Sequence, residues 1–571
     1  ETLGSVQTIC FDKTGTVTQN RMSVKRIWVP DRAINLQNGN FTADCDIGSA
    51  DCEALSHLLH VCVLCNESEV IKEGTDYLLH GTSTENALIN AAIAAGLDVV
   101  GLRKDNRLRK VNHRSEDRHF MATLHQGPAG EQVFSLKGSP LEVLSMCECY
   151  LKAGQRLALT EEIRLEIETE NERMAGQALR VLGFAYSAEV DDSSFENPGG
   201  LTWLGLVGMA DPIREGVKDL IPLFHTAGID TIMITGDQSS TAYSIGKELD
   251  LSRGRPLEIL DSTRLSDLDP ETLKALSQRV HVFARVSPAH KLQIVQALQK
   301  AGRIVAMTGD GINDGPALKA ADIGVALGAS GTDVAREVAD VILEKDDLET
   351  MILAVGHGRT IYSNIRKSLH FLLATNFSEI MVMFAAGATG IGYPLSARQL
   401  LWINLISDIF PGLALAMEAP EPDVLRKPPR DPQETIVRKS DFKNISIEAA
   451  FMTGGALFSY LYGLARFGAG PQAGTLAFQS LTLGQLLHAI SCRSDRHSIF
   501  GKEKLPPNKY LNWALGGSLA IQLMTMVVPG LRGLLGLAPI GLADAVVVGV
   551  SSVAPLLINE ARKDIPKDGA L

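Results

Sequence analysis

A carboxylate placed directly after a short apolar run is the feature of this chain that most directly suggests chemistry. Asp12 follows the apolar run from Val6 to Phe11, which is typical of a buried strand, and it stands where that strand opens into a loop. In open α/β sheets, reactive groups gather at the carboxyl ends of strands. A carboxylate there can attack phosphorus and hold the phosphoryl group as an acyl phosphate. The segment Asp12-Lys13-Thr14-Gly15-Thr16 therefore predicts phosphoryl transfer onto Asp12.

The residue two positions after Asp12 indicates what becomes of such an intermediate. Phosphatases of the haloacid-dehalogenase fold carry a second aspartate there, which serves as the acid and base for hydrolysis. This chain has Thr14 at that position. Without the general acid and base, we expect the acyl phosphate to persist long enough to drive another process.

Three further segments could complete a phosphoryl-transfer site. Two of them follow apolar runs at 229–234 and 304–307, so their loops and the Asp12 loop can converge on one edge of a sheet. Any one of these motifs alone could be a solvated turn, because Gly-Asp and Asn-Asp are turn formers. Their joint occurrence favours a catalytic site. The segments are Thr235-Gly236-Asp237, Phe283 to Lys291, and Thr308 to Asp314.

In this order, the four motifs resemble those of P-type ATPases, the ion pumps that pass through an aspartyl phosphate. The resemblance implies a catalytic domain of the haloacid-dehalogenase-like α/β fold. Catalysis of phosphoryl transfer is mostly positioning and electrostatics. By the resemblance, Lys291 would neutralise the phosphoryl group, and Asp310, with Asp12 and the Thr14 carbonyl, would hold Mg²⁺ through hard oxygen ligands.

The resemblance also assigns the remaining catalytic positions. Asn313 and Asp314 would orient phosphate and metal ligands, and Thr235 and Gly236 would bind phosphoryl oxygens. The sequence contains no GxxxxGK[ST] loop, which argues against a P-loop ATPase. The implied catalytic set is Asp12, Lys13, Thr14, Thr235, Gly236, Asp237, Lys291, Asn313 and Asp314.

An insertion of about 180 residues separates the Asp12 loop from the next strand near residue 205, and its own apolar pattern predicts a separate domain. Its motifs resemble the nucleotide-binding domain of the same pumps, which implies ATP as the bound nucleotide. Lys137 would line the adenine pocket, Glu85 would contact the base and Arg180 would reach the phosphates. His113 stands where the family usually stacks a Phe, and an imidazole offers less apolar area. The implied nucleotide-site residues are Glu85, His113, Lys137, Gly138 and Arg180.

Length, charge and cysteine content narrow the class of protein. A chain of 571 residues should hold several domains, and its net charge of −12 gives no reason to expect a nucleic-acid partner. Six apolar stretches of roughly membrane-spanning length follow residue 345. The eight cysteines suggest reduced, buried thiols, with soft-metal or redox pairs at Cys62/Cys65 and Cys147/Cys149 as the alternative. The apolar stretches are 368–390, 398–419, 444–466, 474–492, 510–530 and 539–558.

Basic residues between these stretches predict a topology. The second and fourth connections and the end of the chain are rich in Lys and Arg, whereas the first, third and fifth hold little beyond Arg398, Arg466 and Arg532. By the positive-inside rule, we expect a multi-pass membrane protein whose catalytic domains face the cytosol, at the plasma membrane in a bacterium. The stretch 474–492 is short and polar, so a re-entrant or amphipathic segment is its alternative. The basic residues are Arg426, Lys427, Arg430, Arg438, Lys439, Lys443, Arg493, Arg496, Lys502, Lys504, Lys509, Arg562, Lys563 and Lys567.

Two of the apolar stretches carry polar groups that lipid would not tolerate. Asn376 and Glu379 share one face of the first, and Asn404, Ser407 and Asp408 share one face of the second. Intramembrane carboxylates are costly and usually mark an ion path, although a polar pair that holds helices together is the alternative. Pro411 would free carbonyls nearby. The oxygen ligands suit a hard cation such as Ca²⁺.

These positions resemble the ion site of the type II pumps, and most closely that of the sarco/endoplasmic-reticulum calcium pump and its bacterial relatives. Six spans after the catalytic domain also argue against heavy-metal pumps, which have two there. Gln485 falls where the calcium pump has an acid, so the number of ions stays open. The favoured activity is ATP-driven Ca²⁺ transport. Pumping of Mn²⁺ or of a monovalent cation, and a membrane-tethered phosphatase, remain alternatives.

The sequence predicts a multidomain membrane protein that resembles the C-terminal half of such a pump. No Thr-Gly-Glu loop occurs, so we expect the actuator domain and four further spans to reside in a missing N-terminal half. A regulatory subunit derived from a decayed pump is the alternative. Asp211-Pro212 looks like the hinge back to the catalytic domain, and 254–276 like a surface excursion without function. The predicted domains are 1–24 and 205–344 (phosphorylation, α/β), 25–204 (nucleotide-binding, α+β), 345–367 (stalk) and 368–571 (six transmembrane helices).

Overall fold

The computed structural model describes residues 2–30, 32–37, 40–41, 53–74, 76–115, 118–187, 195, 198–495, 497–501 and 505–563. The chain divides into two compact units, described separately below. The sheet unit comprises Thr8–Pro222 and Asp230–Leu348, and the helical unit comprises Glu1–Gln7, Leu223–Ile229 and Glu349–Leu571. Two of the eight cysteines, Cys45 and Cys52, and four of the basic residues named above, Arg496, Lys502, Lys504 and Lys567, lie outside the described residues.

A parallel sheet of seven strands carries Asp12 at its centre. The strand order is β15-β16-β14-β1-β17-β18-β19, and every neighbouring pair is parallel. Strand β1 (Thr8–Asp12) is buried along its whole length, as expected for a parallel strand with helices on both faces of the sheet. The other strands are β14 (Asp230–Ile234), β15 (Ile259–Asp261), β16 (Val282–Ala284), β17 (Val305–Gly309), β18 (Ile323–Leu327) and β19 (Val341–Leu343).

Helices between these strands pack against the sheet and close its core. Ile294 of α9 and Leu318 of α10 lie in one apolar cluster with Ile234, Phe283 and Met307 of the strands. The interpretation of 254–276 as a surface excursion is wrong, because β15 is the edge strand of this sheet and Leu265 and Leu273 lie in its apolar cluster. The helices are α6 (Val217–Thr226), α7 (Ser239–Glu248), α8 (Pro270–Ser277), α9 (Pro288–Lys300), α10 (Gly315–Ala320) and α11 (Asp333–Val338).

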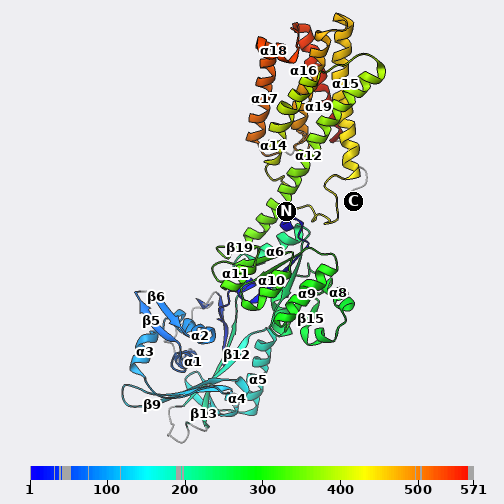
Figure 1. Cartoon of the computed structure of the whole chain (residues 1–571). Coiled ribbons are helices and arrows are strands. Elements are labelled where there is room, and N and C mark those ends of the chain that lie inside the picture. Colours follow the sequence, from blue (N-terminus) through cyan, green and yellow to red (C-terminus); the bar gives the residue numbers. More distant parts are fainter. Residues whose placement is uncertain are drawn as a thin grey trace. The chain divides into compact units, whose positions relative to one another are not determined.

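A second, mostly antiparallel sheet of ten strands belongs to the same unit (Figure 1). Helices α1 and α2 cover one of its faces, and α4 and α5 cover the other, each with its own apolar cluster. A separate hairpin, β5 with β6, and helix α3 lie beside α1. The elements are β2 (Ser23–Val29), β3 (Arg32–Gln37), β4 (Asn40–Phe41), α1 (Glu53–Leu64), β5 (Glu69–Glu73), β6 (Asp76–His80), α2 (Ser83–Ala94), α3 (Val99–Asp105), β7 (Arg107–Asn112), β8 (Phe120–Gln126), β9 (Gln132–Gly138), α4 (Pro140–Ser145), β10 (Cys147–Lys152), β11 (Gln155–Ala158), α5 (Glu161–Gly176), β12 (Arg180–Ser187) and β13 (Leu201–Ala210).

The two strands at the predicted ends of the insertion pair with each other. Strand β2 contains the predicted boundary at 24/25, β13 contains the one at 204/205, and the two strands are antiparallel neighbours. The chain therefore enters and leaves the segment 25–204 through two neighbouring strands, as an inserted domain requires.

The helical unit is a bundle whose first helix is unusually long. Helix α12 (Glu349–Thr389) runs without interruption for 41 residues through both the predicted stalk and the first apolar stretch. The second stretch is one helical segment that widens in the middle, where a π-helical turn at Asn404–Asp408 joins α13 (Ala397–Ile403) to α14 (Ile409–Ala416). The remaining helices are α15 (Lys439–Phe467), α16 (Pro471–Ser491), α17 (Lys509–Val527), α18 (Pro529–Leu535) and α19 (Leu542–Lys563).

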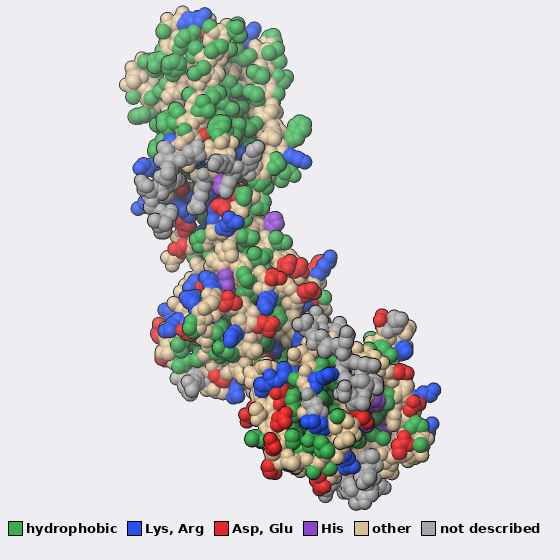
Figure 2. Space-filling view, turned by 180° about the vertical axis from the view of Figure 1, so that it is seen from behind, with side chains coloured by type: hydrophobic (Ala, Val, Ile, Leu, Met, Phe, Trp, Pro, Cys, Tyr) green, Lys and Arg blue, Asp and Glu red, His purple; other side chains and the backbone are tan. Residues whose placement is uncertain are grey.

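Part of this bundle has the length and apolarity of membrane spans. Among the described residues, three helical segments qualify: α12, the continuous Ala397–Ala416 and α19. The number rises to at most five if each sharply bent pair is one span, the pairs being α17 with α18, and α2 with α3 of the sheet unit. Single helices also occupy the predicted stretches at 444–466 and 474–492. Figure 2 shows hydrophobic side chains over the visible face of the bundle, and Phe384, Leu401 and Trp513 are exposed.

Candidate active site and cation site

Asp12 ends the central strand of the parallel sheet in direct contact with a lysine. Lys291 Nζ lies 2.6 Å from Asp12 Oδ1 and 2.6 Å from Asp314 Oδ1, and all three side chains are buried. Helix α9 supplies this lysine in its first turn, where Ser287 caps the helix and Pro288 stands at its start. The structure thus brings together the nucleophile, the cation and one acid predicted from the strand-end motifs.

Three carboxylates crowd this strand end. Oxygen atoms of Asp12, Asp310 and Asp314 all lie within 4.8 Å of one another. Burial and the Asp314 carboxylate raise the pKa of Asp12, and Lys291 opposes them, while burial raises the pKa of Asp310 to about 6 with Asp314 acting in the same sense. Three carboxylates carry more negative charge than one ammonium group neutralises, and a divalent cation would balance the excess. Its oxygen donors fit Mg²⁺.

Gly15 allows the loop after Asp12 to approach these acids. Its φ is +75°, and a Cβ built there would lie 1.6 Å from Asp310 Oδ2. Its carbonyl accepts a hydrogen bond of 2.5 Å from Arg214 Nη2. Both the left-handed backbone and the lack of space therefore require glycine at this position.

The remaining predicted catalytic residues surround the same loop. Lys13 Nζ pairs with Asp237 Oδ2 at 2.7 Å, and the backbone N–H of Asp237 donates to Thr235 Oγ1 at 3.1 Å. The space around Gly236 is open, since the nearest atom to a Cβ built there is 3.7 Å away. Asn313 is exposed on the short helical turn Ile312–Asp314, next to buried Asp314.

The residues that brace this loop were not predicted from the sequence. Thr18 Oγ1 donates to Asp211 Oδ2 at 2.6 Å, and the backbone N–H of Arg21 donates to Asp211 Oδ1 at 3.1 Å. Arg214 Nε donates to the Thr18 carbonyl at 3.2 Å. Asp211 and Arg214 therefore fix the outgoing end of the Asp12 loop, and Asp211 does more than mark a hinge.

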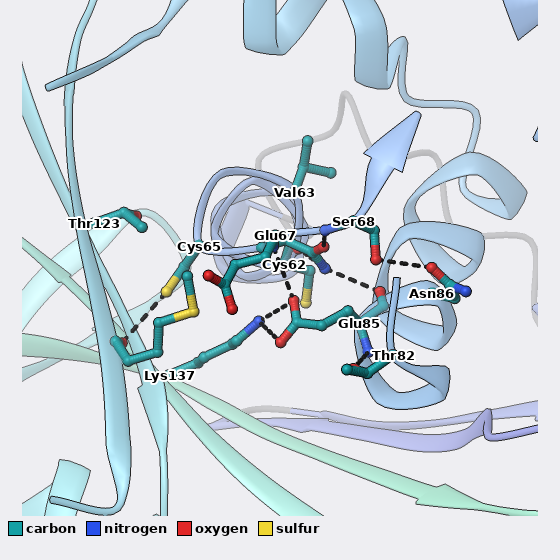
Figure 3. A network of polar contacts seen from close by, with 12 residues as sticks. Cys62, Val63, Cys65, Glu67, Ser68, Thr82, Glu85, Asn86, Thr123 and Lys137 are labelled. Carbon is teal, nitrogen blue, oxygen red and sulfur yellow. Dashed lines mark hydrogen bonds and ion pairs between the residues drawn. The ribbon is translucent and has the colours of Figure 1, made fainter. Parts of the chain in front are cut away.

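A buried ion pair joins two of the predicted nucleotide-site residues in the second sheet (Figure 3). Lys137 Nζ on β9 lies 2.6 Å from Oε1 and 2.5 Å from Oε2 of Glu85 in the first turn of α2. The two side chains are 5% and 13% exposed. Thr82 caps α2 by accepting from the Glu85 N–H, which holds the acid at the start of the helix.

The other predicted nucleotide-site residues lie at different distances from this pair. His113 Nδ1 contacts Glu67 Oε1 at 2.9 Å, and the Glu67 N–H donates to Glu85 Oε2 at 3.3 Å, so His113 is three contacts away from Lys137. Arg180 is exposed at the start of β12. Phe184 of the same strand pairs with Lys137, and Arg180 lies four residues before Phe184, so Arg180 and Lys137 are on the same face of the sheet. Position 138 has space only for glycine, because a Cβ there would lie 2.5 Å from the Phe120 Cβ.

The two acids of the predicted spans lie in two hydrogen-bonded groups, which adjoin because Ser407 of one group precedes Asp408 of the other. Asn404 Nδ2 donates to Glu379 Oε2 at 3.4 Å, and Gln485 Nε2 on α16 donates to Glu379 Oε1 at 3.3 Å. Ser407 Oγ donates to Gln485 Oε1 at 3.0 Å. Asn376 Nδ2 donates to Asp408 Oδ2 at 3.0 Å. All six residues predicted for the cation path thus lie together; Ser378, whose hydroxyl contacts Gln485, was missed.

One oxygen of this network is left without a partner. Asp408 Oδ1 is buried and has no hydrogen-bond partner among the described residues. Asp408 ends the π-helical turn, three residues before Pro411, in the region where freed carbonyls are expected. π-Helical turns are frequent at functional sites. An unpaired carboxylate oxygen among amide and hydroxyl oxygens is what a hard cation needs.

The described cysteines are free thiols. Cys10, Cys62, Cys65, Cys147 and Cys492 are buried and Cys149 is half-buried. Cys65 Sγ donates to the Met121 carbonyl, and burial raises the pKa of this thiol to about 11. Cys62 and Cys65 therefore behave as core residues, in line with the preferred interpretation.

Comparison with known proteins identifies the family. Residues 54–216 match the family described as P-type ATPase, cytoplasmic domain N, and residues 392–565 match Cation transporting ATPase, C-terminus. A calcium-transporting ATPase of Bacillus subtilis is 36% identical over 574 residues, which is 98% of this chain. The chain belongs to the P-type ATPases.

Other relatives of this P-type ATPase chain carry the same designation. Calcium-transporting ATPase 1 of Bacillus cereus is 38% identical over 99% of the chain, and human calcium-transporting ATPase type 2C member 1 is 35% identical over 99%. The chain spans 64% of the length of both Bacillus proteins and 61% of the human one. The match runs through both units of the structure.

Proposed function

We propose that this chain is the part of an ATP-driven cation pump that carries the phosphorylated aspartate, the nucleotide site and a cation path, with Ca²⁺ as the favoured cargo. The observation that carries the proposal is the contact of Lys291 with Asp12 at the end of a central parallel strand, among three acids. Relatives named as calcium-transporting ATPases support the choice of cargo. The network of Glu379 and Asp408 supports a cation path in the same chain.

The residues at the strand end suit an in-line transfer from ATP to Asp12. A carboxylate oxygen of Asp12 forms the new bond to the γ-phosphorus, the bond to the bridging oxygen breaks, and ADP leaves with that electron pair. Lys291 is placed to neutralise charge on the phosphoryl oxygens, and Asp314 holds Lys291 in position. Mg²⁺, when bound by Asp12, Asp310 and the Thr14 carbonyl, supplies charge neutralisation. The Thr235 hydroxyl and the Gly236 N–H would bind phosphoryl oxygens.

The ATP itself would bind in the second sheet. Lys137 and Glu85 form the polar floor of the adenine site, His113 would stack on the base and Arg180 would reach the phosphates. Gly138 keeps the end of β9 close to Phe120. The contact between Lys137 and Glu85 supports this assignment, because it puts a donor and an acceptor side by side at the start of α2.

Glu379, Asp408 and their amide and hydroxyl neighbours would hold the cation. The two carboxylates balance the charge of one divalent ion, and Gln485 adds a neutral oxygen where a third acid would favour a second ion. Asn376 and Glu379 lie on α12, the helix that also forms the predicted stalk. Phosphorylation of Asp12 would reach the cation site by reshaping the stalk at 345–367.

The finer architecture belongs to the same proposal. We infer that the seven-stranded sheet is a haloacid-dehalogenase-like phosphorylation domain (1–24 and 205–344) and that 25–204 is the nucleotide-binding domain. Six spans within 368–571 would place the catalytic parts in the cytosol of a multi-pass membrane protein, which in a bacterium would be at the plasma membrane. A Thr-Gly-Glu actuator domain and four more spans would come from the rest of the pump.

The test of the proposal is phosphoenzyme formation from labelled ATP in membranes that contain the complete protein. The reaction is titrated separately with Ca²⁺, Mn²⁺, Na⁺ and K⁺. We expect acid-stable labelling that needs micromolar Ca²⁺, or Mn²⁺ if that is the cargo. Labelling that does not depend on any of the four cations would be consistent with the phosphorylation site but would refute the transport assignment.

Replacing Gly15 by Ala is expected to reduce the rate of phosphoenzyme formation at least about a hundredfold, because a displacement of about 1 Å at a reacting group has that effect. The added methyl group would force Asp310 away from Asp12. Rapid-quench labelling with saturating ATP measures the rate. Gly254→Ala is the matched control, since Gly254 has a φ of +73° and no atom within 4 Å of an added Cβ. Equal rates in the two variants would refute the steric argument.

A further inference from the structure

A second group of metal-binding side chains lies in the helical unit, apart from the acids of the cation path. His370 of α12, His488 of α16 and Cys492 directly after α16 each offer a ligand atom within 4.8 Å of the others, and Glu448 of α15 contacts both histidines. His370 Nε2 lies 2.6 Å from Glu448 Oε2, and His488 Nε2 lies 3.5 Å from the same oxygen. Cys492 Sγ lies 3.3 Å from His488 Nε2. Neither the sequence motifs nor the pump mechanism uses these residues.

The separations of the contacting donor atoms are close to those around a tetrahedral metal ion. Two imidazoles, a thiolate and a carboxylate are ligands of Zn²⁺. Around Zn²⁺, the distances between neighbouring N, O and S donors are about 3.3–3.6 Å, as follows from the usual bond lengths. The separations of 3.3 and 3.5 Å fall on this range, and the hydrogen-bonded pair at 2.6 Å would have to open by less than about 1 Å.

The surroundings leave these donors buried yet accessible. His488 is buried, and its Nε2 is the atom that faces Cys492 and Glu448. Phe371 stacks on the His488 ring, and the four metal-binding side chains line a cavity of about 720 Å³ that gives access to them.

We propose that His370, Glu448, His488 and Cys492 form a binding site for Zn²⁺ that is separate from the path of the transported cation. The donor sets distinguish the two sites: nitrogen and sulfur contribute three of four ligands here, whereas the cation path offers only oxygen. Because the four ligands come from three helices, the bound ion ties α12 to α15 and α16. Residue 370 lies on the same helix as Asn376 and Glu379, so the ion restrains the helix that carries part of the cation path.

Titration of the purified full chain in detergent with Co²⁺ tests the site, since Co²⁺ takes the place of Zn²⁺ and is visible in absorption. We expect a thiolate-to-cobalt charge-transfer band together with the intense visible bands of tetrahedral Co²⁺, and both should vanish when Zn²⁺ is added. Binding at the oxygen sites of Asp310 or Asp408 gives weak octahedral bands without charge transfer. A titration that shows only such weak bands would overturn the proposal.

Two variants assign the bands to these residues. Cys492→Ser should abolish the charge-transfer band, and His370→Asn should weaken Co²⁺ binding by at least about tenfold, which is the size of loss seen when support of a metal site is removed. Cys147→Ser is the matched control, because Cys147 is also a buried thiol whose Sγ donates to a backbone carbonyl. An unchanged band in Cys492→Ser, or its loss in Cys147→Ser, would place the metal elsewhere and refute the assignment.

Discussion

Asp12→Asn is expected to lower acid-stable labelling from ATP by at least about a thousandfold, the scale of loss when a covalent nucleophile is removed. The amide has nearly the shape of the carboxylate, but its oxygen is a poor nucleophile and cannot carry the phosphoryl group as an acyl phosphate. Lys291 keeps its contact with Asp314, so no unpaired buried ammonium results and the fold should persist. The variant therefore separates the chemistry of Asp12 from its structural role.

Labelling with γ-labelled ATP, followed by an acid quench and electrophoresis, measures this prediction. Asp269→Asn is the control, since Asp269 caps α8 through its side chain and asparagine caps equally well. The control should be labelled like the unmodified protein. Acid-stable label that persists in Asp12→Asn would mean that another residue is phosphorylated and would remove the proposed mechanism.

The same experiment distinguishes two other kinds of protein. A membrane-tethered phosphatase would need an acid at the position of Thr14 and would hold little phosphoenzyme at steady state. A regulatory subunit derived from a decayed pump would not be labelled, and it predicts loss of the catalytic contacts. The pairing of Lys291 with both Asp12 and Asp314 argues against such decay.

The catalytic strand end could be predicted because each of its parts has a local signal. Asp12 and Asp310 follow buried apolar runs, and parallel strands bring such loops to one edge whatever their separation in sequence. In the structure, Lys291 contacts Asp12 and Asp314, which belong to two of these loops. Helix and strand periodicity likewise revealed the long apolar helices and the face shared by Asn404 and Asp408.

Features that depend on unrelated parts of the chain had no such signal. The bond between Thr18 and Asp211 joins residues 193 positions apart, and no spacing rule marks either of them. His370, Glu448 and His488 are single polar residues on three helices, so only packing reveals that they meet. The edge strand β15 is three residues long, too short to show a period, which is why its segment was interpreted as an excursion.

The different hydrogen bonding of Glu379 and Asp408 leads to the second large expected effect. Glu379 is held by two amide donors, from Asn404 and Gln485, whereas Asp408 has one amide donor on Oδ2 and a buried Oδ1 without a partner among the described residues. An anion left in this state in an apolar bundle is costly unless a cation or a proton neutralises it. Asp408 is thus the acid whose charge the transported cation should satisfy.

Asp408→Asn is accordingly expected to raise the cation concentration needed for half-maximal labelling from ATP by at least about tenfold, because ligand charge sets the affinity of such sites. Labelling of Asp12 by inorganic phosphate, which needs no transported cation, should survive, so loss of the cation response will not reflect misfolding. Asp544→Asn is the control, since Asp544 is a buried acid of the same bundle that pairs with Arg466. Cation activation that is kept in Asp408→Asn but lost in Asp544→Asn would place the cation path near α19. The polar residues around Asp408 would then serve to hold the helices together.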